Sequence, residues 1–230
     1  MPEKSQIQTM FSNIAQGYDR ANDILSFGFY KQWYKKLIKT ASPKNYDRII
    51  DLATGTGNLA IQFKKYNCTL EVFGIDFSEK MLSIAQKKSQ KENLNITWLP
   101  GDATELQFPD NSFDIATISF GIRNVSSIQN CLIEMARVVK KDGKILILEF
   151  GTPSGFFKYL YQYYSNIIIP LIGGLITGNR KAYSYLNQSS LEFPYGQKFV
   201  EIINETKLFK NHYYESLFNG IAFLYYTEVI

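Results

Sequence analysis

The 230-residue sequence predicts an α/β protein with a doubly wound, mostly parallel seven-stranded sheet. From residue 48 to residue 150, short apolar segments alternate with amphipathic ones, which is typical of strands joined by crossover helices. The apolar segments are continuous rather than alternating, which indicates strands buried on both faces of a parallel sheet. After residue 150 the alternation stops. We therefore expect a helical insertion there, followed by a closing pair of strands.

The N-terminal segment, residues 1–42, is predicted to be a helical lid. Trp33, Leu37 and Ile38 follow a helical period with lysines between them, and a helix is expected over residues 5–40. The Ser42-Pro43 step ends it.

The central segment supplies five strands and the helices between them. Strands are predicted at residues 48–53, 71–76, 95–99, 113–120 and 144–150, and helices at residues 58–66, 79–92 and 128–139. Ser78 is a suitable N-cap for the second of these helices. We expect right-handed crossovers between parallel strands.

The C-terminal segment is predicted to complete a single domain over residues 1–230. Residues 152–195 are aromatic and apolar, and we expect a helical insertion over the carboxyl edge of the sheet. A helix at residues 198–208 follows. Residues 212–218 and 222–229 could form an antiparallel pair with Asn219-Gly220 as the hairpin turn.

Composition excludes several classes of protein. A net charge of +4 without a basic block argues against a nucleic-acid partner. With one histidine and two cysteines that lack ligand spacing, neither a metal site nor a Ser-His-Asp triad is expected. The N-terminus has no apolar signal segment, and the apolar stretch at residues 167–177 is too short to span a bilayer. We expect a cytoplasmic protein.

The most informative stretch is the glycine turn after the first predicted strand. Gly55, Thr56 and Gly57 follow that strand and precede a helix, so backbone N–H groups can approach a ligand closely. The pattern fits binders of NAD, FAD and S-adenosylmethionine (SAM) equally. Asp51, four residues before Gly55, favours SAM because a carboxylate suits a cationic ligand and repels a pyrophosphate.

Two further carboxylates follow neighbouring strands. Asp76 ends the second strand and could accept both ribose hydroxyls, and Phe77 follows it. Asp102, before Ala103, could accept the exocyclic amine of adenine. With Asp51 they are predicted to line one crevice, although aspartates in such positions also serve as turn formers or caps.

The sequence resembles the class I SAM-dependent methyltransferases, and within them the ubiquinone/menaquinone biosynthesis C-methyltransferases. The resemblance covers nearly the whole chain and rests on MFSNIAQGYDRANDILSFGFYKQW, DLATGTGN, GIDFSEKML, GDATELQFPDNSFD, ISFGIRNV, RVVKKDGKILILEF, YSYLNQSSLEFP and NGIAFLYY. It implies SAM contacts at Thr56, Asp76, Asp102-Ala103 and Ser119. It also implies a 2-polyprenyl-1,4-naphthoquinol or a polyprenyl benzoquinol as methyl acceptor. Two departures are Asn58, where the family often has Asp, and the tyrosine-rich C-terminus.

Four residues are candidates for the chemistry. Arg123 and Asn124 follow the fourth strand, at the edge where the acceptor is expected. Arg123 stays protonated, so its role is to favour a quinolate oxygen or to position a water; the alternative is a salt bridge with a nearby carboxylate. Tyr18 and Asp19 could cover the sulfonium, through a cation–π face and a charge partner or proton acceptor, or could simply pack the lid.

Three questions stay open at this stage. Residues 156–176 could hold an isoprenoid tail, rest on a membrane or pack as an ordinary insertion. The chain could form a homodimer. Alternative functions are methylation of another small aromatic or lipid acceptor, an NAD-dependent oxidoreductase, or a methyltransferase-like subunit that binds SAM without activity.

Overall fold

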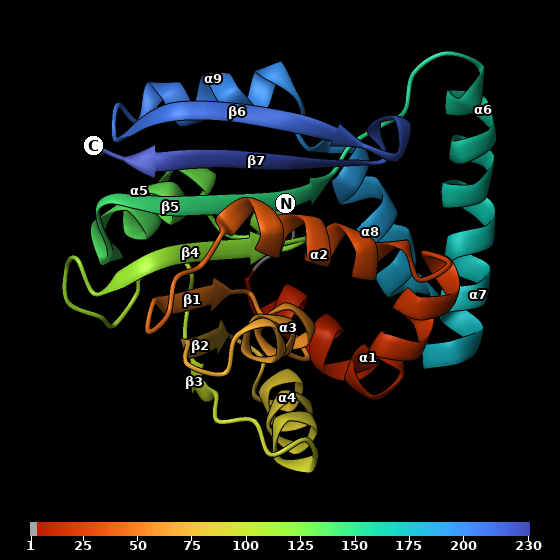
Figure 1. Cartoon of the computed structure of the whole chain (residues 1–230). Helices are drawn as coiled ribbons and strands as arrows, with labels where there is room; N and C mark the ends of the chain where they lie inside the picture. Colours follow the sequence, from red (N-terminus) through yellow and green to blue (C-terminus); the bar gives the residue numbers. More distant parts are fainter. Residues whose placement is uncertain (1–3) are drawn as a thin grey trace.

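One seven-stranded sheet forms the centre of the structure, a computed structural model that describes residues 4–230 (Figure 1). The strands are β1 (Arg48–Leu52), β2 (Glu71–Asp76), β3 (Thr97–Pro100), β4 (Phe113–Ser119), β5 (Val139–Phe150), β6 (Phe209–Leu217) and β7 (Ala222–Val229). Their spatial order is β3-β2-β1-β4-β5-β7-β6, with β1 to β5 parallel and β7 antiparallel to both neighbours. The predicted fold class is confirmed. The order reverses between β1 and β4, and ligands of such sheets bind at this switch point.

Helices cover both faces of this sheet. They are α1 (Lys4–Leu25), α2 (Phe29–Ala41), α3 (Asn58–Tyr66), α4 (Glu79–Lys91), α5 (Ile128–Val138), α6 (Phe156–Tyr163), α7 (Ile169–Thr177), α8 (Arg180–Glu192) and α9 (Gln197–Glu205), with short helical turns η1 (Ile122–Asn124), η2 (Tyr164–Ile168) and η3 (Phe218–Gly220). Neighbouring strand residues join opposite cores: Ile49 packs with α2 and α3, and Ile50 packs with α5 and α9. This two-sided burial explains the continuous apolar strands.

Several boundaries differ from the predictions. The expected helix 5–40 is two helices, because the chain turns at Phe27 and Gly28, which both have positive φ. The third strand begins at residue 97 rather than 95. The fifth begins at Val139, where an irregular pairing with Phe113 extends it by several residues. Helix α9 ends at residue 205 rather than 208.

The closing hairpin has a longer turn than expected. Leu217 pairs with Ala222, so the four residues 218–221 form the loop. Asn219 and Gly220 both take positive φ inside it, as residues of their type readily do. The antiparallel pair is confirmed, but the connection is not a two-residue turn.

The remaining helices gather at the carboxyl edge of the sheet. In Figure 1, α6, η2 and α7 form one column at the right of the view, α8 lies between that column and the sheet, and α1 crosses below. Ile14 and Ala21 of α1 share a buried core with Met81, Ala182 and Tyr183. Within residues 4–230 no helix is both long and apolar enough to span a bilayer.

Candidate active site

Two adjoining cavities lie at the carboxyl ends of β1, β2 and β4, where the strand order reverses. The smaller, the inner cavity, has a volume of about 80 Å³, and the larger, the outer cavity, has about 590 Å³. Tyr18, Ala53, Gly55, Ser119 and Phe120 line both cavities, so the two adjoin at these residues. A ligand in one cavity would therefore lie next to a ligand in the other.

Asp76 presents its carboxylate to the inner cavity. One oxygen accepts the Gly55 N–H at 2.7 Å and the other accepts the Ser78 N–H at 2.8 Å. Burial raises the pKa of this carboxyl to about 6, against the lowering effect of the two N–H groups. Each oxygen keeps a lone pair for another donor. The group can thus receive two neighbouring hydroxyls of a ligand.

The two glycines of the turn have different roles. Both have positive φ, 57° at Gly55 and 77° at Gly57. A Cβ on Gly55 would meet nothing within 4 Å, so this position borders open ligand space. A Cβ on Gly57 would lie 2.4 Å from the ring of Trp98, so this glycine serves the packing of α3 onto the sheet. Gly57 lines neither cavity.

Asp51 lies beneath the site rather than in it. It is fully buried, and its oxygens accept the hydroxyls of Thr54 at 2.6 Å and Thr117 at 2.7 Å. Burial raises its pKa to about 7. Asp51 lines neither cavity, so the expectation that three carboxylates line one crevice is corrected to two, Asp76 and Asp102. The reason is that Asp51 falls inside β1, where its side chain bonds to the neighbouring strand.

The other expected cofactor-binding residues surround the inner cavity. Phe77, Asp102, Ala103 and Ser119 line it. One Asp102 oxygen accepts both the N–H and the hydroxyl of Thr104 at 2.8 Å, which fixes the carboxylate. Thr56 lines the outer cavity instead. The sequence-based set thus gathers around one site, except for Asp51 and Gly57.

The two lid candidates, Tyr18 and Asp19, are separated by the structure. Tyr18 lines both cavities, and burial raises its pKa. Asp19 lines neither: it accepts the Thr56 hydroxyl at 2.5 Å and the Asn58 amide at 2.8 Å, and pairs with Lys88 at 2.8 Å. Asp19 therefore ties α1 to the glycine turn and to α4.

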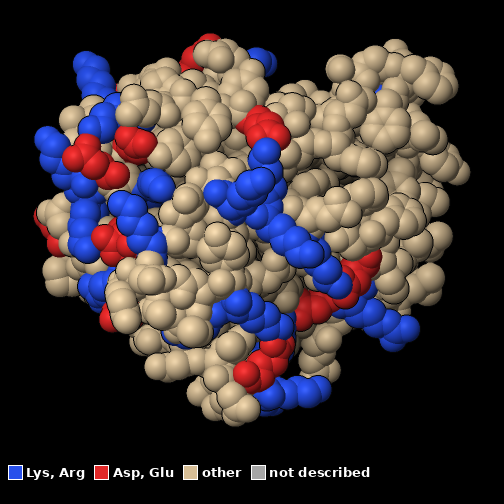
Figure 2. Space-filling model, viewed as in Figure 1, with Lys and Arg blue, Asp and Glu red and all other residues tan. Residues whose placement is uncertain are grey.

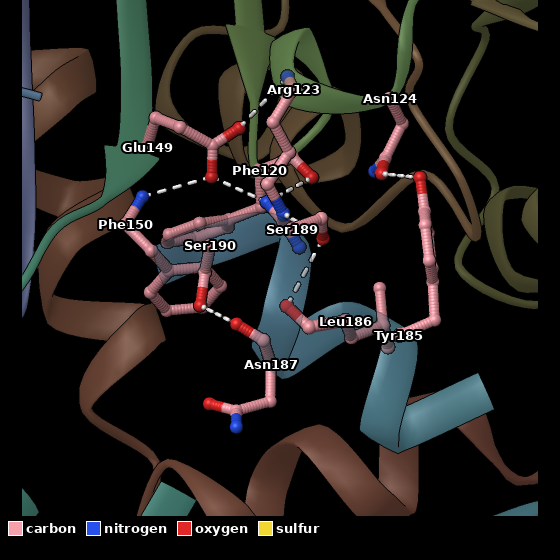
Figure 3. Close-up of polar contacts among 10 residues, drawn as sticks. All are labelled: Phe120, Arg123, Asn124, Glu149, Phe150, Tyr185, Leu186, Asn187, Ser189 and Ser190. Atoms are coloured by element: carbon pink, nitrogen blue, oxygen red, sulfur yellow. Dashed lines mark hydrogen bonds and ion pairs between the residues drawn. The ribbon is translucent and has the colours of Figure 1, made fainter. Parts of the chain in front are cut away.

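Arg123 is held by a buried ion pair with Glu149 (Figure 3). The side chain of Arg123 is 5% exposed and that of Glu149 is fully buried. Arg123 also donates to the Phe120 carbonyl at 2.8 Å and to the Ser189 hydroxyl at 3.3 Å. The sequence left two interpretations of Arg123, a salt bridge and an interaction with the acceptor. The salt bridge is present, and Arg123 also lines the outer cavity, so the structure is compatible with both.

Sequence reasoning did not single out Glu149. Burial raises its pKa, while the Arg123 charge and N–H donors oppose that shift. The available signal was a carboxylate that follows four consecutive apolar residues in the strand KILILEF, because a buried acid needs a partner. Asn124 lines the inner cavity, and its side-chain oxygen accepts the Tyr185 hydroxyl at 3.2 Å (Figure 3).

The outer cavity is aromatic and almost uncharged. Among its described lining residues are Tyr30, Trp33, Tyr34, Phe150, Tyr161 and Tyr183, and Arg123 is the one that carries a charge. Its positive charge acts to lower the pKa of Tyr161, although burial, the larger effect, raises that pKa to about 12. Such a cavity suits a flat apolar molecule with one anionic oxygen. Tyr185 does not line it, and His212 lies on β6, away from both cavities.

A mixed seven-stranded sheet with a glycine turn after β1 and a carboxylate ending β2 is the architecture of the class I SAM-dependent methyltransferases. Solved structures agree with this fold. A SAM-dependent methyltransferase of Thermotoga maritima, described as a possible histamine N-methyltransferase, superposes with a TM-score of 0.67 at 18% identity, covering 96% of this chain and 99% of that one. A SAM-dependent methyltransferase of Aquifex aeolicus gives 0.65 at 18% identity over the full length of both.

Sequence relatives define the family more narrowly. The chain belongs to the ubiE/COQ5 methyltransferase family, whose model matches residues 2–228. It is 44% identical to a ubiquinone/menaquinone biosynthesis C-methyltransferase of Bdellovibrio bacteriovorus, over 97% of this chain and 96% of the relative. It is 43% identical to a demethylmenaquinone methyltransferase of Thermus thermophilus, over 80% and 84%. The protein is a SAM-dependent C-methyltransferase, and the family excludes an NAD-dependent oxidoreductase.

Proposed function

We propose that this methyltransferase acts on a ring carbon of demethylmenaquinol, a 2-polyprenyl-1,4-naphthoquinol. The observation that carries the proposal is the outer cavity: it has aromatic walls and one guanidinium, and it shares five lining residues with the inner cavity. The names of the two relatives support the same acceptor class. A polyprenyl benzoquinol is the second candidate, because the first relative's name includes ubiquinone.

The inner cavity is proposed to hold SAM, which supplies an electrophilic methyl group. Asp76 would accept the ribose hydroxyls through its free lone pairs. Asp102 and Ala103 would meet the adenine, Gly55 would leave room for the ligand, and Ser119 would lie beside the transferred group. Tyr18 would cover the junction of the two cavities.

Arg123 is proposed to favour the ionised form of a ring hydroxyl. In the described residues no hydrogen bond uses its outer nitrogen Nη2, which leaves a donor for the acceptor. An ionised hydroxyl makes the ring carbon more nucleophilic. With SAM bound, the ring carbon would take the methyl group as the carbon–sulfur bond breaks, the sulfur would leave as a neutral thioether, and the ring carbon would lose its proton to water. Stabilisation of such an oxyanion typically contributes about 10²–10³ in rate.

Transfer of a labelled methyl group from SAM tests this function. We expect the naphthoquinol to gain one CH₂ in mass and the oxidised quinone to gain nothing, because the oxidised ring is electron-poor. Asp76→Ala should abolish SAM binding in calorimetry. If SAM binds but no methyl group is transferred to either quinol, the proposal is contradicted. The remaining functions would then be methylation of another aromatic or lipid acceptor, or a SAM-binding subunit without activity.

The variant Arg123→Met, together with a double variant, distinguishes a role of Arg123 in catalysis from a role in folding stability. It removes the oxyanion donor, so kcat should fall by about 10²–10³. It also leaves the buried Glu149 without its charged partner, which costs about 3–5 kcal/mol of folding stability. The double variant Arg123→Met/Glu149→Gln removes that buried charge and should recover stability but not kcat. Full kcat in the double variant would show that Arg123 is only structural.

We also infer that the protein works at the surface of a membrane, because its proposed acceptor is a membrane lipid. A homodimer stays a prediction, which sedimentation equilibrium would test.

A further inference from the structure

The column formed by α6, η2 and α7 leaves its outward face uncovered. Large apolar side chains recur along it at helical spacing: Phe156 is 88% exposed, Tyr159 70% and Leu175 79%, with Ile167 and Leu171 also exposed. We call these five residues the apolar stripe. The opposite face packs inward through Ser165, Pro170 and Gly173. An exposed apolar stripe of this kind on a protein surface marks an interaction site.

The charged residues of the chain segment that carries the apolar stripe are all basic. Between Glu149 and Glu192 the sequence has no acidic residue and three basic ones, Lys158, Arg180 and Lys181, all exposed. Figure 2 shows charged side chains gathered at the left and centre of the view, whereas the right, where α6 and α7 lie, carries almost none. An uncharged apolar face with basic residues at its margins complements anionic lipid headgroups over acyl chains.

The outer cavity opens on this same side. Four of its lining residues are themselves exposed: Phe27 (76%), Leu160 (58%), Tyr163 (59%) and Phe218 (49%). Leu160 and Tyr163 belong to α6, next to the stripe, and Phe27 stacks on Tyr164 at 6.1 Å. The mouth of the cavity is therefore apolar and continuous with the stripe.

The volume of the outer cavity limits how much of the acceptor it can enclose. About 590 Å³ is the volume of a pocket for one drug-sized molecule. The ring of a polyprenyl quinol and the start of its tail would fill it, so the rest of a long tail must leave through the mouth. Outside the mouth, only an apolar phase holds the tail without exposing it to water.

We propose that the apolar stripe and the cavity mouth dock on an anionic lipid bilayer, so that the acceptor's ring enters the outer cavity while its tail stays in the membrane. The tail argument rests on the proposed function. The docking surface rests on the exposed residues and the basic margin. The chain lies on the bilayer and does not cross it.

Vesicle flotation of the full-length protein with SAM tests the surface. The variant Phe156→Ser/Leu175→Ser removes the two most exposed stripe residues, neither of which lines a cavity. We expect binding to phosphatidylcholine vesicles containing phosphatidylglycerol to fall by about tenfold or more, because each side chain contributes a large apolar surface. The matched control Tyr66→Ser/Ile133→Ser, exposed apolar residues of α3 and α5, should bind like the original protein.

A second variant tests the basic margin, which consists of the three exposed basic residues named above. The variant with all three residues changed, Lys158→Gln/Arg180→Gln/Lys181→Gln, should bind anionic vesicles no more tightly than pure phosphatidylcholine vesicles. Its difference in binding from the original protein should be smaller at high salt. Equal binding by the stripe and control variants would overturn the proposal. So would a dimer in vesicle-free solution that the stripe substitutions dissociate, since the stripe would then join two copies.

Activity separates this inference from the proposed function. The stripe variant should methylate a short-tailed, water-dispersed quinol at the original rate and a vesicle-embedded long-tailed quinol several-fold more slowly. No activity on either acceptor by the original protein would refute the proposed function alone. Equal rates of the stripe variant and the original protein on the vesicle-embedded quinol would refute the docking surface.

Discussion

Gly55 and Gly57 stand two residues apart in the same turn, yet glycine is required for a different reason at each position. Both have positive φ, so alanine costs about 1–2 kcal/mol in backbone strain at either site. At Gly55 the added carbon would enter the ligand space, and at Gly57 it would strike Trp98. The two positions therefore form a matched pair.

We expect Gly55→Ala to stay folded with SAM affinity reduced tenfold or more, about 1.4 kcal/mol. Gly57→Ala should instead lose more stability than Gly55→Ala, because a buried ring must move. Thermal unfolding and calorimetric SAM titration of both variants check this. Similar unfolding temperatures for the two variants would contradict the assignment of Gly57 to packing.

The buried carboxyl of Asp51 should make stability depend on pH. Its folded pKa is about 7 against an unfolded value of 3.8, because burial disfavours the charge. Between those values the folded chain binds more protons than the unfolded chain, so stability falls as pH rises and levels off above about 7. Asp51→Asn should reduce the slope by up to about 1.4 kcal/mol per pH unit.

Urea unfolding between about pH 5 and pH 8 measures that slope. Asp76 contributes in the same direction, since burial raises its pKa to about 6, so some slope should remain in the variant. An unchanged slope in Asp51→Asn would show that Asp51 is not the titrating group.

At the scale of elements, helix α1 decides access to the inner cavity. Ile7, Phe11 and Tyr18 of α1 line that cavity, whose 80 Å³ holds only a handful of waters. SAM is much larger, so we propose that α1 acts as a lid that moves to admit it. The turn at Phe27 and Gly28 separates α1 from α2 and is a suitable hinge.

Hydrogen exchange should show this movement. SAM is expected to slow exchange in α1 by tenfold or more, with α9, which lies beside β6 and away from α1 (Figure 1), unaffected. Asp19→Ala removes the ties to Thr56, Asn58 and Lys88, so it should speed exchange in α1 and weaken SAM binding, although Asp19 lines neither cavity. Exchange in α1 that SAM leaves unchanged would exclude a lid.

At the scale of the whole molecule, the sheet edge, the lid and the α6–α8 insertion together set the volume open to the acceptor. KM for water-dispersed quinols should fall by about tenfold or more with each of the first isoprene units, because each buried CH₂ contributes about 0.8 kcal/mol. The fall should stop once the tail reaches the mouth at Phe27 and Leu160. Steady-state kinetics over a tail-length series measures this. A continuous fall over long tails would mean that the tail lies inside the protein.

The sequence alone determined the sheet class, the glycine turn and the strand ends that carry Asp76 and Asp102. These features are local, because periodicity sets each element and parallel strands bring their carboxyl ends to one edge. Asp51 favoured SAM as the ligand, and the family resemblance implied the same methyl donor and added the acceptor class.

Only the tertiary structure decided which side chains meet. Asp51 bonds to Thr117, 66 residues away, instead of lining the crevice. Asp19 pairs with Lys88, and Arg123 with Glu149, at separations of 69 and 26 residues. Such pairs depend on how helices and strands pack, which no local pattern encodes. The acceptor cavity and its mouth are likewise enclosed by elements from both ends of the chain, and they exist only once those elements have packed together.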